Sequence, residues 1–110
     1  MYESLGDTSL DLLRAFEAAA RLRSFTAAAV ELGTTQPAVS QQIKRLEEQL
    51  ATRLFDRIYR GIELTDAGAT LFEAVQAGLQ NIDNGLAAIT AQTQHEVLQV
   101  ATVSTRPTRR

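Results

Sequence analysis

Residues Thr35–Leu50 read TQPAVSQQIKRLEEQL, and this stretch is the strongest indication of the fold in the sequence. Its aliphatic side chains recur at helical spacing and so fall on a single stripe of one helix. These residues are Val39, Ile43, Leu46 and Leu50. Thr35 can cap the first N–H groups, and a proline such as Pro37 suits the first turn.

The rest of the helix surface carries small polar and basic side chains. They are Pro37, Ser40, Gln41, Lys44 and Arg45. Side chains of this kind can hydrogen-bond to base edges in a DNA major groove. An ordinary surface helix with a solvated polar face would show the same pattern, so this helix alone leaves both interpretations open.

Length and composition limit the other possibilities. The chain has 110 residues, of which 45% are hydrophobic, enough for one domain with a small core. It contains no cysteine, which excludes disulfides and thiolate metal sites. Because it shows neither a charged-then-apolar leader nor an apolar run of membrane-spanning length, we expect a cytoplasmic location and no membrane partner.

The net charge of −2 argues mildly against a nucleic-acid partner, but the charges are unevenly distributed. From Thr34 to Ile62 the basic residues outnumber the acidic ones, whereas Glu63 to Glu96 contains five acids and no lysine or arginine. Positive charge is therefore concentrated around the predicted helix. For nucleic-acid binding, this distribution matters more than the total.

Two shorter helices are predicted before this stretch. The first covers Leu10–Leu22 after a Thr8 or Ser9 cap, and its expected inner face is Leu10, Leu13, Phe16 and Ala20. The second covers Phe25–Leu32 after a Ser24 cap and ends at Gly33, a residue suited to a left-handed helix stop. The small Ala28 and Ala29 permit a close helix crossing, as in a helix-turn-helix.

A short β-hairpin is predicted next, formed by Leu54–Ile58 and Ile62–Thr65 around the turn Tyr59–Arg60–Gly61. A hairpin that follows a helix-turn-helix is a wing. Arg57 and Arg60 lie where they can reach a phosphate or a minor groove. The alternative is a solvent-exposed turn whose arginines only keep the loop soluble.

A long helix is predicted from Asp66 to about Thr93, with Thr65 as its cap and Asp66 at the positive end of its dipole. Apolar residues recur along it at spacings of three and four, close to a heptad seam. They are Leu71, Val75, Leu79, Ile82, Leu86 and Ile89. A small core cannot cover so long a seam, so it is expected to meet a second copy, with Gly78 and Gly85 marking close packing. The alternative is a stripe that packs only on its own domain.

Residues His95–Thr105 alternate apolar and polar side chains and are predicted to form a β-strand. Because a lone strand leaves its edges unpaired, we expect the chain to be cut from a longer one as a second domain begins. The expected division is therefore a winged domain at 1–65, a linker helix at 66–93, and the start of an effector-binding domain with a tail at 94–110.

Together these stretches resemble the N-terminal part of a LysR-type bacterial transcriptional regulator, over roughly Leu10 to Ile89. The matching segments are Leu13–Phe16, Ser24–Thr26 with Ala28–Ala29, Thr35–Ser40, Gln42–Ile43, Leu46–Glu47, Leu54–Arg57 and Leu64–Gly68. The resemblance implies a mainly α fold, namely a winged helix-turn-helix of three helices and a two-stranded wing, followed by a long dimerising linker helix. A periplasmic-binding-protein-like domain that senses a small molecule would follow in the full-length protein.

The resemblance also implies roles for individual residues. Base-reading residues would be Gln36, Pro37, Ser40 and Gln41, and contacts to the DNA backbone or from the wing would come from Thr26, Thr35, Lys44, Arg45, Arg57 and Arg60. Gln41 stands where many members have arginine, which favours adenine or mixed readout over a bidentate guanine contact. Ala51 replaces a common glycine, so a less sharp helix end is expected there.

The leading expectation is sequence-specific binding to double-stranded DNA by a homodimer, or a tetramer, on an interrupted dyad. A coiled-coil oligomerisation module without specific DNA binding is the alternative. An enzyme is the weakest possibility, because His95 is the only histidine and the adjacent Glu47 and Glu48 point to different parts of a helix. We therefore expect no catalytic residue, cofactor or metal.

Overall fold

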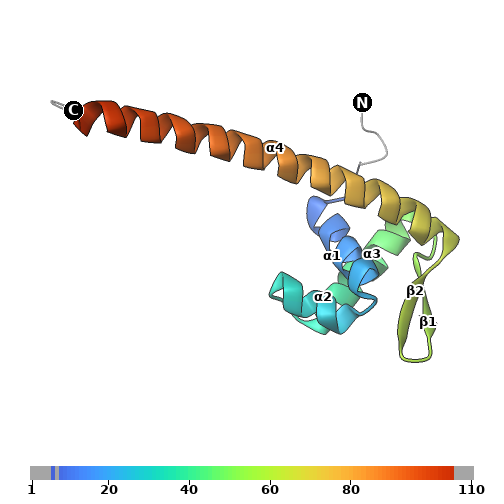
Figure 1. The fold of residues 1–110 in the computed structure, drawn as a ribbon. Helices are drawn as coiled ribbons and strands as arrows, with labels where there is room; N and C mark the ends of the chain where they lie inside the picture. The colour runs from blue at the N-terminus through green and yellow to red at the C-terminus, as the bar shows by residue number, and fades with distance from the viewer. Residues whose placement is uncertain (1–5, 7, 106–110) are drawn as a thin grey trace. The chain divides into compact units, whose positions relative to one another are not determined.

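The structure is a computed structural model that describes residue 6 and residues 8–105, with side chains described up to residue 94. Its elements are α1 (Leu10–Leu22), α2 (Phe25–Leu32), α3 (Gln36–Leu50), β1 (Phe55–Ile58), β2 (Gly61–Leu64) and α4 (Asp66–Thr105) (Figure 1). The chain divides into a winged unit that ends at Gln76 and a helical unit that begins at Ala77. The mainly helical class with a two-stranded wing is as predicted.

The first three helices begin at the caps expected from the sequence. The hydroxyls of Ser9, Ser24 and Thr35 accept hydrogen bonds from the backbone N–H three residues later, at 3.0–3.2 Å. Each bond satisfies a donor that has no partner inside its helix and is worth about 1 kcal/mol. The predicted starts of all three helices are confirmed.

The helix ends also follow local chemistry, with one correction. Gly33 ends α2 with a φ of 68°, as predicted. The expectation of a blurred end at Ala51 is wrong, because Ala51 adopts a φ of 54° and its N–H bonds to carbonyl oxygens at the end of α3. These bonds impose the left-handed conformation on alanine at a cost of about 1–2 kcal/mol.

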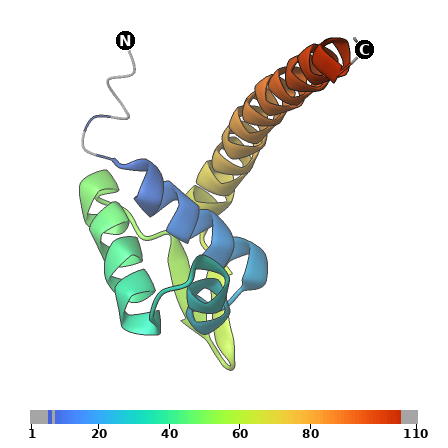
Figure 2. The same ribbon diagram turned by 90° about the vertical axis from the view of Figure 1, so that its left-hand side faces the viewer.

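The core of the winged unit lies where α1, α2 and α3 pack against one another (Figure 2). Its largest fully buried side chains are Phe16, Leu46, Leu54 and Val39. Ala28 and Ala29 are also buried, as expected for small residues at a close crossing. The rings of Phe16 and Phe55 lie 5.5 Å apart, so the start of the hairpin belongs to this core.

The inner face of α1 differs in part from the predicted one. Phe16 and Ala20 are buried as predicted, but Leu10 is 51% exposed and Leu13 is only half-buried. The buried face also includes Leu12, Ala15 and Ala19, which were not predicted. A helix with many apolar residues offers more than one possible stripe, and the packing of α2 and α3 selects among them. Leu50 was predicted to lie on the inner stripe of α3, but it is 39% exposed because it lies at the end of the helix.

The hairpin pairs β1 and β2 in antiparallel register, from Phe55 opposite Leu64 to Ile58 opposite Gly61. Strand β1 begins one residue later than predicted, at Phe55, and β2 is shifted by one residue, because it includes Gly61 and ends before Thr65. Helix α4 then begins at the expected cap, since the Thr65 hydroxyl accepts from Gly68 N–H at 3.0 Å. A Cβ on Gly68 would lie 2.1 Å from the Leu54 carbonyl oxygen, a close approach that was not predicted.

The predicted strand at His95–Thr105 is wrong, because α4 continues as a helix through Thr105 instead of ending near Thr93. A helix satisfies its backbone hydrogen bonds within the segment, whereas a strand needs a neighbour. Apart from β1 and β2, the described part of the chain contains no strand that could pair. The basic tail at 106–110 lies outside the described residues. Within the described part, no helix is long and apolar enough to cross a membrane.

Candidate nucleic-acid interface

The outer face of α3 presents the residues predicted to read bases. Gln36, Pro37 and Gln41 are exposed, and Ser40 is half-buried. The Gln36 amide donates a 2.7 Å hydrogen bond to the Ser40 hydroxyl, which orders both side chains. Gln41 makes no hydrogen bond to any described residue, so its amide keeps both a donor and an acceptor for a base edge.

Two predicted backbone contacts lie at helix N-termini. Thr35 caps α3 by accepting from Ala38 N–H at 3.2 Å, which leaves its hydroxyl proton free to donate to a phosphate oxygen. Thr26 lies exposed in the first turn of α2. The free N–H groups and the dipole at such ends favour an anion.

A groove of about 270 Å³ runs between α3 and the hairpin. It brings Ser40 and Lys44 on α3 together with Arg57 on β1. This proximity could not be predicted from the sequence alone. Arg53, one of the basic residues between Thr34 and Ile62, lines the same groove, although it was not among the residues predicted to contact DNA. Its guanidinium lies 3.6 Å from Asp56 and donates to the Phe55 carbonyl at 3.2 Å.

Glu47 also lines the groove but serves the fold. Its carboxylate accepts hydrogen bonds from the N–H groups of Leu54 and Phe55, at 2.7 and 3.3 Å. This contact joins the last turn of α3 to the start of the hairpin and so sets the distance between the two sides of the groove. Without these hydrogen bonds, the negative charge of Glu47 would weaken phosphate binding in the groove.

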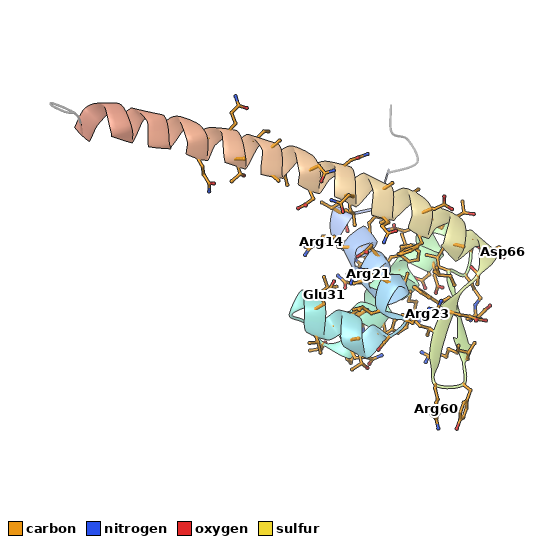
Figure 3. The ribbon with its side chains drawn as sticks, viewed as in Figure 1. Arg14, Arg21, Arg23, Glu31, Arg60 and Asp66 are labelled. Atoms are coloured by element: carbon orange, nitrogen blue, oxygen red, sulfur yellow. The ribbon has the colours of Figure 1, made fainter. Side chains whose placement is uncertain are left out.

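The tip of the hairpin carries Arg60, which points away from the helices (Figure 3). Its guanidinium carbon lies 5.2 Å from the centre of the Tyr59 ring. Arg45 is exposed on α3 and lies outside the groove. In the part of the chain that the structure describes, Lys44, Arg45, Arg57 and Arg60 form no ion pair.

Other charges are used within the fold. Arg21 on α1 pairs with Glu17 at 2.8 Å and with Glu31 on α2, and so ties the two helices together (Figure 3). Hydrogen bonds to Glu17 and Glu31 raise the pKa of Arg21 above its ordinary value. The hydrogen bond from Arg21 in turn lowers the pKa of Glu31.

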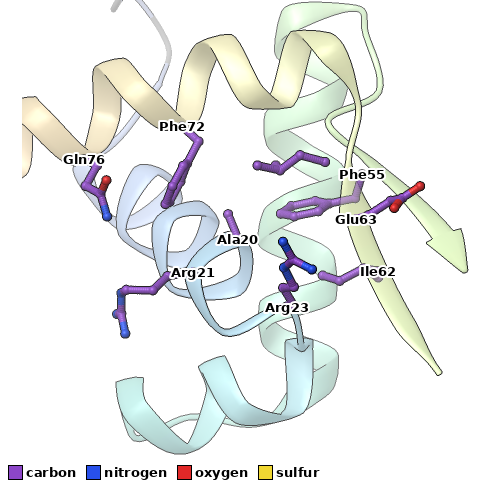
Figure 4. A pocket seen from close by; sticks show the side chains of 9 residues that line it. Ala20, Arg21, Arg23, Phe55, Ile62, Glu63, Phe72 and Gln76 are labelled. Carbon is purple, nitrogen blue, oxygen red and sulfur yellow. The ribbon is translucent and has the colours of Figure 1, made fainter.

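A second cleft, of about 520 Å³, lies among the end of α1, the hairpin and the first turns of α4. Figure 4 shows Arg23, Phe55 and Phe72 among the side chains that line it. None of the residues predicted to contact DNA lines this cleft. The candidate interface is therefore the outer face of α3, the groove beside it and the tip of the hairpin.

The apolar seam of α4 changes character along the helix. Val75 is only 7% exposed within the single chain, so it needs no second copy for its burial. Leu71 and Leu79 are half-buried. Ile82, Leu86 and Ile89 are 50%, 61% and 64% exposed. The beginning of the seam is therefore covered by its own chain, whereas its later part is exposed in the single chain.

Comparison with known proteins decides the family. The sequence profile described as "Bacterial regulatory helix-turn-helix protein, lysR family" matches residues 10–69. The chain belongs to the LysR family. The matched segment runs from the start of α1 into the first turn of α4, and so contains the whole candidate interface.

Curated LysR-family relatives are transcriptional regulators. The transcriptional activator AmpR of Providencia stuartii is 48% identical over 96 residues, which cover 87% of this chain and 33% of AmpR. The transcriptional regulator BudR of Klebsiella aerogenes is 58% identical over 64 residues, 58% of this chain and 45% of BudR. The chain thus spans about a third of the length of AmpR.

Solved LysR-family structures share the fold. The DNA-binding domain of BenM in complex with benA site 1 DNA aligns with a TM-score of 0.71 and 32% identity, covering 78% of this chain and 97% of that one. The CbnR DNA-binding domain in its DNA complex aligns with a TM-score of 0.68 and 31% identity, covering 78% and 99%. These similarities confirm the predicted winged helix-turn-helix.

Proposed function

We propose that this chain is the sequence-specific DNA-binding region of a LysR-type transcriptional regulator. Helix α3 would enter the major groove, and the hairpin would rest on the backbone or in the adjacent minor groove. The observation that carries the proposal is the exposed Gln41 on the outer face of α3, beside a groove that brings Lys44 on α3 together with Arg57 on the hairpin. Similarity to the BenM and CbnR domains, which were solved with DNA, supports it.

Each part of the interface has a chemical task. The face of α3 would read bases through Gln36, Pro37, Ser40 and Gln41. The residues that would hold the phosphate backbone are Thr26, Thr35, Lys44, Arg45 and Arg57, because positive charge and helix N-termini attract phosphate. Arg60 would act from the wing, on a phosphate or in the minor groove.

A second copy is the proposed occupant of the open part of the seam. Ile82, Leu86 and Ile89 lie on one face of α4 and are at least half exposed, although they are apolar. Pairing through this face would give two copies of α3 for the two halves of an interrupted dyad. Effector sensing and assembly into tetramers would require a protein of the length of AmpR. We expect such a protein to act in the bacterial cytoplasm as a regulator and not as an enzyme.

DNA selected from a random pool by the purified chain provides the first test. On the best selected site, Gln41→Ala should cost about 1–3 kcal/mol and relax preference at one or two base positions. Gln76→Ala, an exposed glutamine in the second cleft, is the matched control and should leave affinity unchanged. An equal loss on selected and random DNA would remove Gln41 from base reading.

The alternative, an oligomerisation module without specific binding, is separated by the same selection. It predicts that no sequence is enriched and that affinity depends on salt alone. The proposed function predicts one enriched half-site sequence, repeated in inverted orientation. Salt titration then counts the phosphate contacts, since the logarithmic slope falls by about 0.9 for each contact removed.

Pairing through α4 is tested with Ile82→Asp, which places a charge in the open seam. Separated copies should still fold and bind a half-site, but lose about 10²–10⁴ in affinity for the full dyad. Asn81→Asp adds the same charge at an adjacent exposed polar position and serves as the control. The pairing model would be contradicted by a wild-type chain that sediments as a monomer at micromolar concentration and still binds the full dyad more tightly than a half-site.

A further inference from the structure

The turn of the hairpin consists of Tyr59 and Arg60, between the paired residues Ile58 and Gly61. Tyr59 is 86% exposed, so its ring adds little to the core. The guanidinium of Arg60 lies over that ring, 5.2 Å from its centre, which is within the range of a cation–π contact. The turn thus displays an aromatic side chain and an arginine stacked together.

The backbone of Arg60 gives a second, independent indication. Its φ of 69° is a left-handed conformation that glycine or asparagine adopts with less strain. In the described part of the chain, the Arg60 side chain forms no hydrogen bond or ion pair, and its guanidinium contacts the Tyr59 ring. Strain at a residue that stabilises little else points to a role outside the fold.

We infer that Tyr59 is a positioning residue for Arg60 in DNA binding, an inference that rests on the proposed function. Stacking uses the face of the guanidinium and leaves its N–H groups, which lie in the plane, free to donate to phosphate or base edges. The ring also limits the rotamers of Arg60 before binding, so less conformational entropy is lost in the complex.

The free protein allows a test without DNA. In an NMR spectrum, the Nε–H proton of Arg60 should be shifted by the ring current of Tyr59. The shift should be lost in Tyr59→Ala and kept in Tyr59→Phe, which retains the ring without the hydroxyl. An Arg60 signal that is the same in wild type and Tyr59→Ala would overturn the stacking.

A double-mutant cycle on the best selected site tests the function of the pair. Tyr59→Phe should bind like wild type, and Tyr59→Ala should bind about two- to fivefold more weakly, equivalent to about 0.5–1 kcal/mol. In the Arg60→Ala background, the Tyr59→Ala loss should disappear. Circular dichroism before each titration verifies folding, which an exposed turn residue should not affect.

The remaining outcomes are distinguishable. Additive losses would make Tyr59 a separate DNA contact, and an equal loss in Tyr59→Phe would assign the effect to the hydroxyl; either overturns the inference. Full affinity of Arg60→Ala would also overturn it, while leaving the role of α3 intact. If the wild-type chain enriches no sequence from the random pool, the proposed function itself fails.

Discussion

Replacing Gly68 with alanine tests the junction between the hairpin and α4. The added Cβ would lie 2.1 Å from the Leu54 carbonyl oxygen and 2.8 Å from a methyl group of Leu64. The Leu64 side chain can rotate away, but the Leu54 oxygen is held by a 3.0 Å hydrogen bond from Thr65 N–H. The first turn of α4 would therefore have to move by about 1 Å to restore normal contact.

The cost follows from what this movement disturbs. Overpacking of this kind costs about 1–3 kcal/mol. Weakening the bond between Thr65 and Leu54, and the cap from Thr65 to Gly68 N–H, adds about 1 kcal/mol for each. Alanine returns up to about 1 kcal/mol through its higher helix propensity. The free energy of unfolding should fall by roughly 2–4 kcal/mol.

Gly78→Ala is the matched control in the same helix, since among the described residues no atom outside the adjacent backbone of its own helix lies within 4 Å of the added Cβ. This variant should be more stable than wild type, by about 0.5–1 kcal/mol. Urea unfolding followed by circular dichroism at several protein concentrations measures both variants. A Gly68→Ala protein as stable as wild type would refute the close approach. Concentration-dependent destabilisation in Gly78→Ala would instead place a second copy at that glycine.

Three further predictions concern the helical part of the winged unit. Glu47→Ala should lower the free energy of unfolding by about 1.5–3 kcal/mol, because it leaves two backbone N–H groups without their carboxylate partner. In the same urea titration, Glu48→Ala at the exposed neighbouring position should change this free energy by less than about 0.5 kcal/mol. Equal effects would contradict the role of Glu47. Ala51→Gly should raise the thermal midpoint by relieving left-handed strain of about 1 kcal/mol, and an unchanged midpoint would argue against the observed helix end. Because the Arg21 hydrogen bond lowers the pKa of Glu31, the contribution of this pair is complete above about pH 5 and is lost as the pH falls through the lowered pKa. The difference in unfolding free energy between wild type and Glu31→Gln should therefore shrink only in acid, and a difference that is constant with pH would contradict the pair.

The family resemblance and the starts of the helices could be predicted because they depend on short segments. A cap such as Ser9, Ser24 or Thr35 acts on the N–H three residues later, and the stop at Gly33 needs only its own backbone freedom. The face of α3 that presents Gln41 follows equally from helical periodicity. These features involve interactions over at most four or five residues, which a sequence displays directly.

The remaining features required contacts between distant segments. Only packing could choose Leu12 over Leu10 for the core, and only the hairpin beside α3 could bring Arg57 to Lys44. Alternation at His95–Thr105 predicted a strand, but a strand needs a partner and a helix does not.

The caps, the turns and the polar face of α3 could therefore be predicted from the sequence alone, because each depends on residues that are close to one another in the sequence. Tertiary structure decided which apolar stripes are buried, why residue 68 must be glycine, and where the seam of α4 becomes open. The physical reason is that burial and close contact are properties of pairs of segments. Val75 and Ile82 are both apolar and fit one heptad pattern, yet Val75 is buried and Ile82 is exposed.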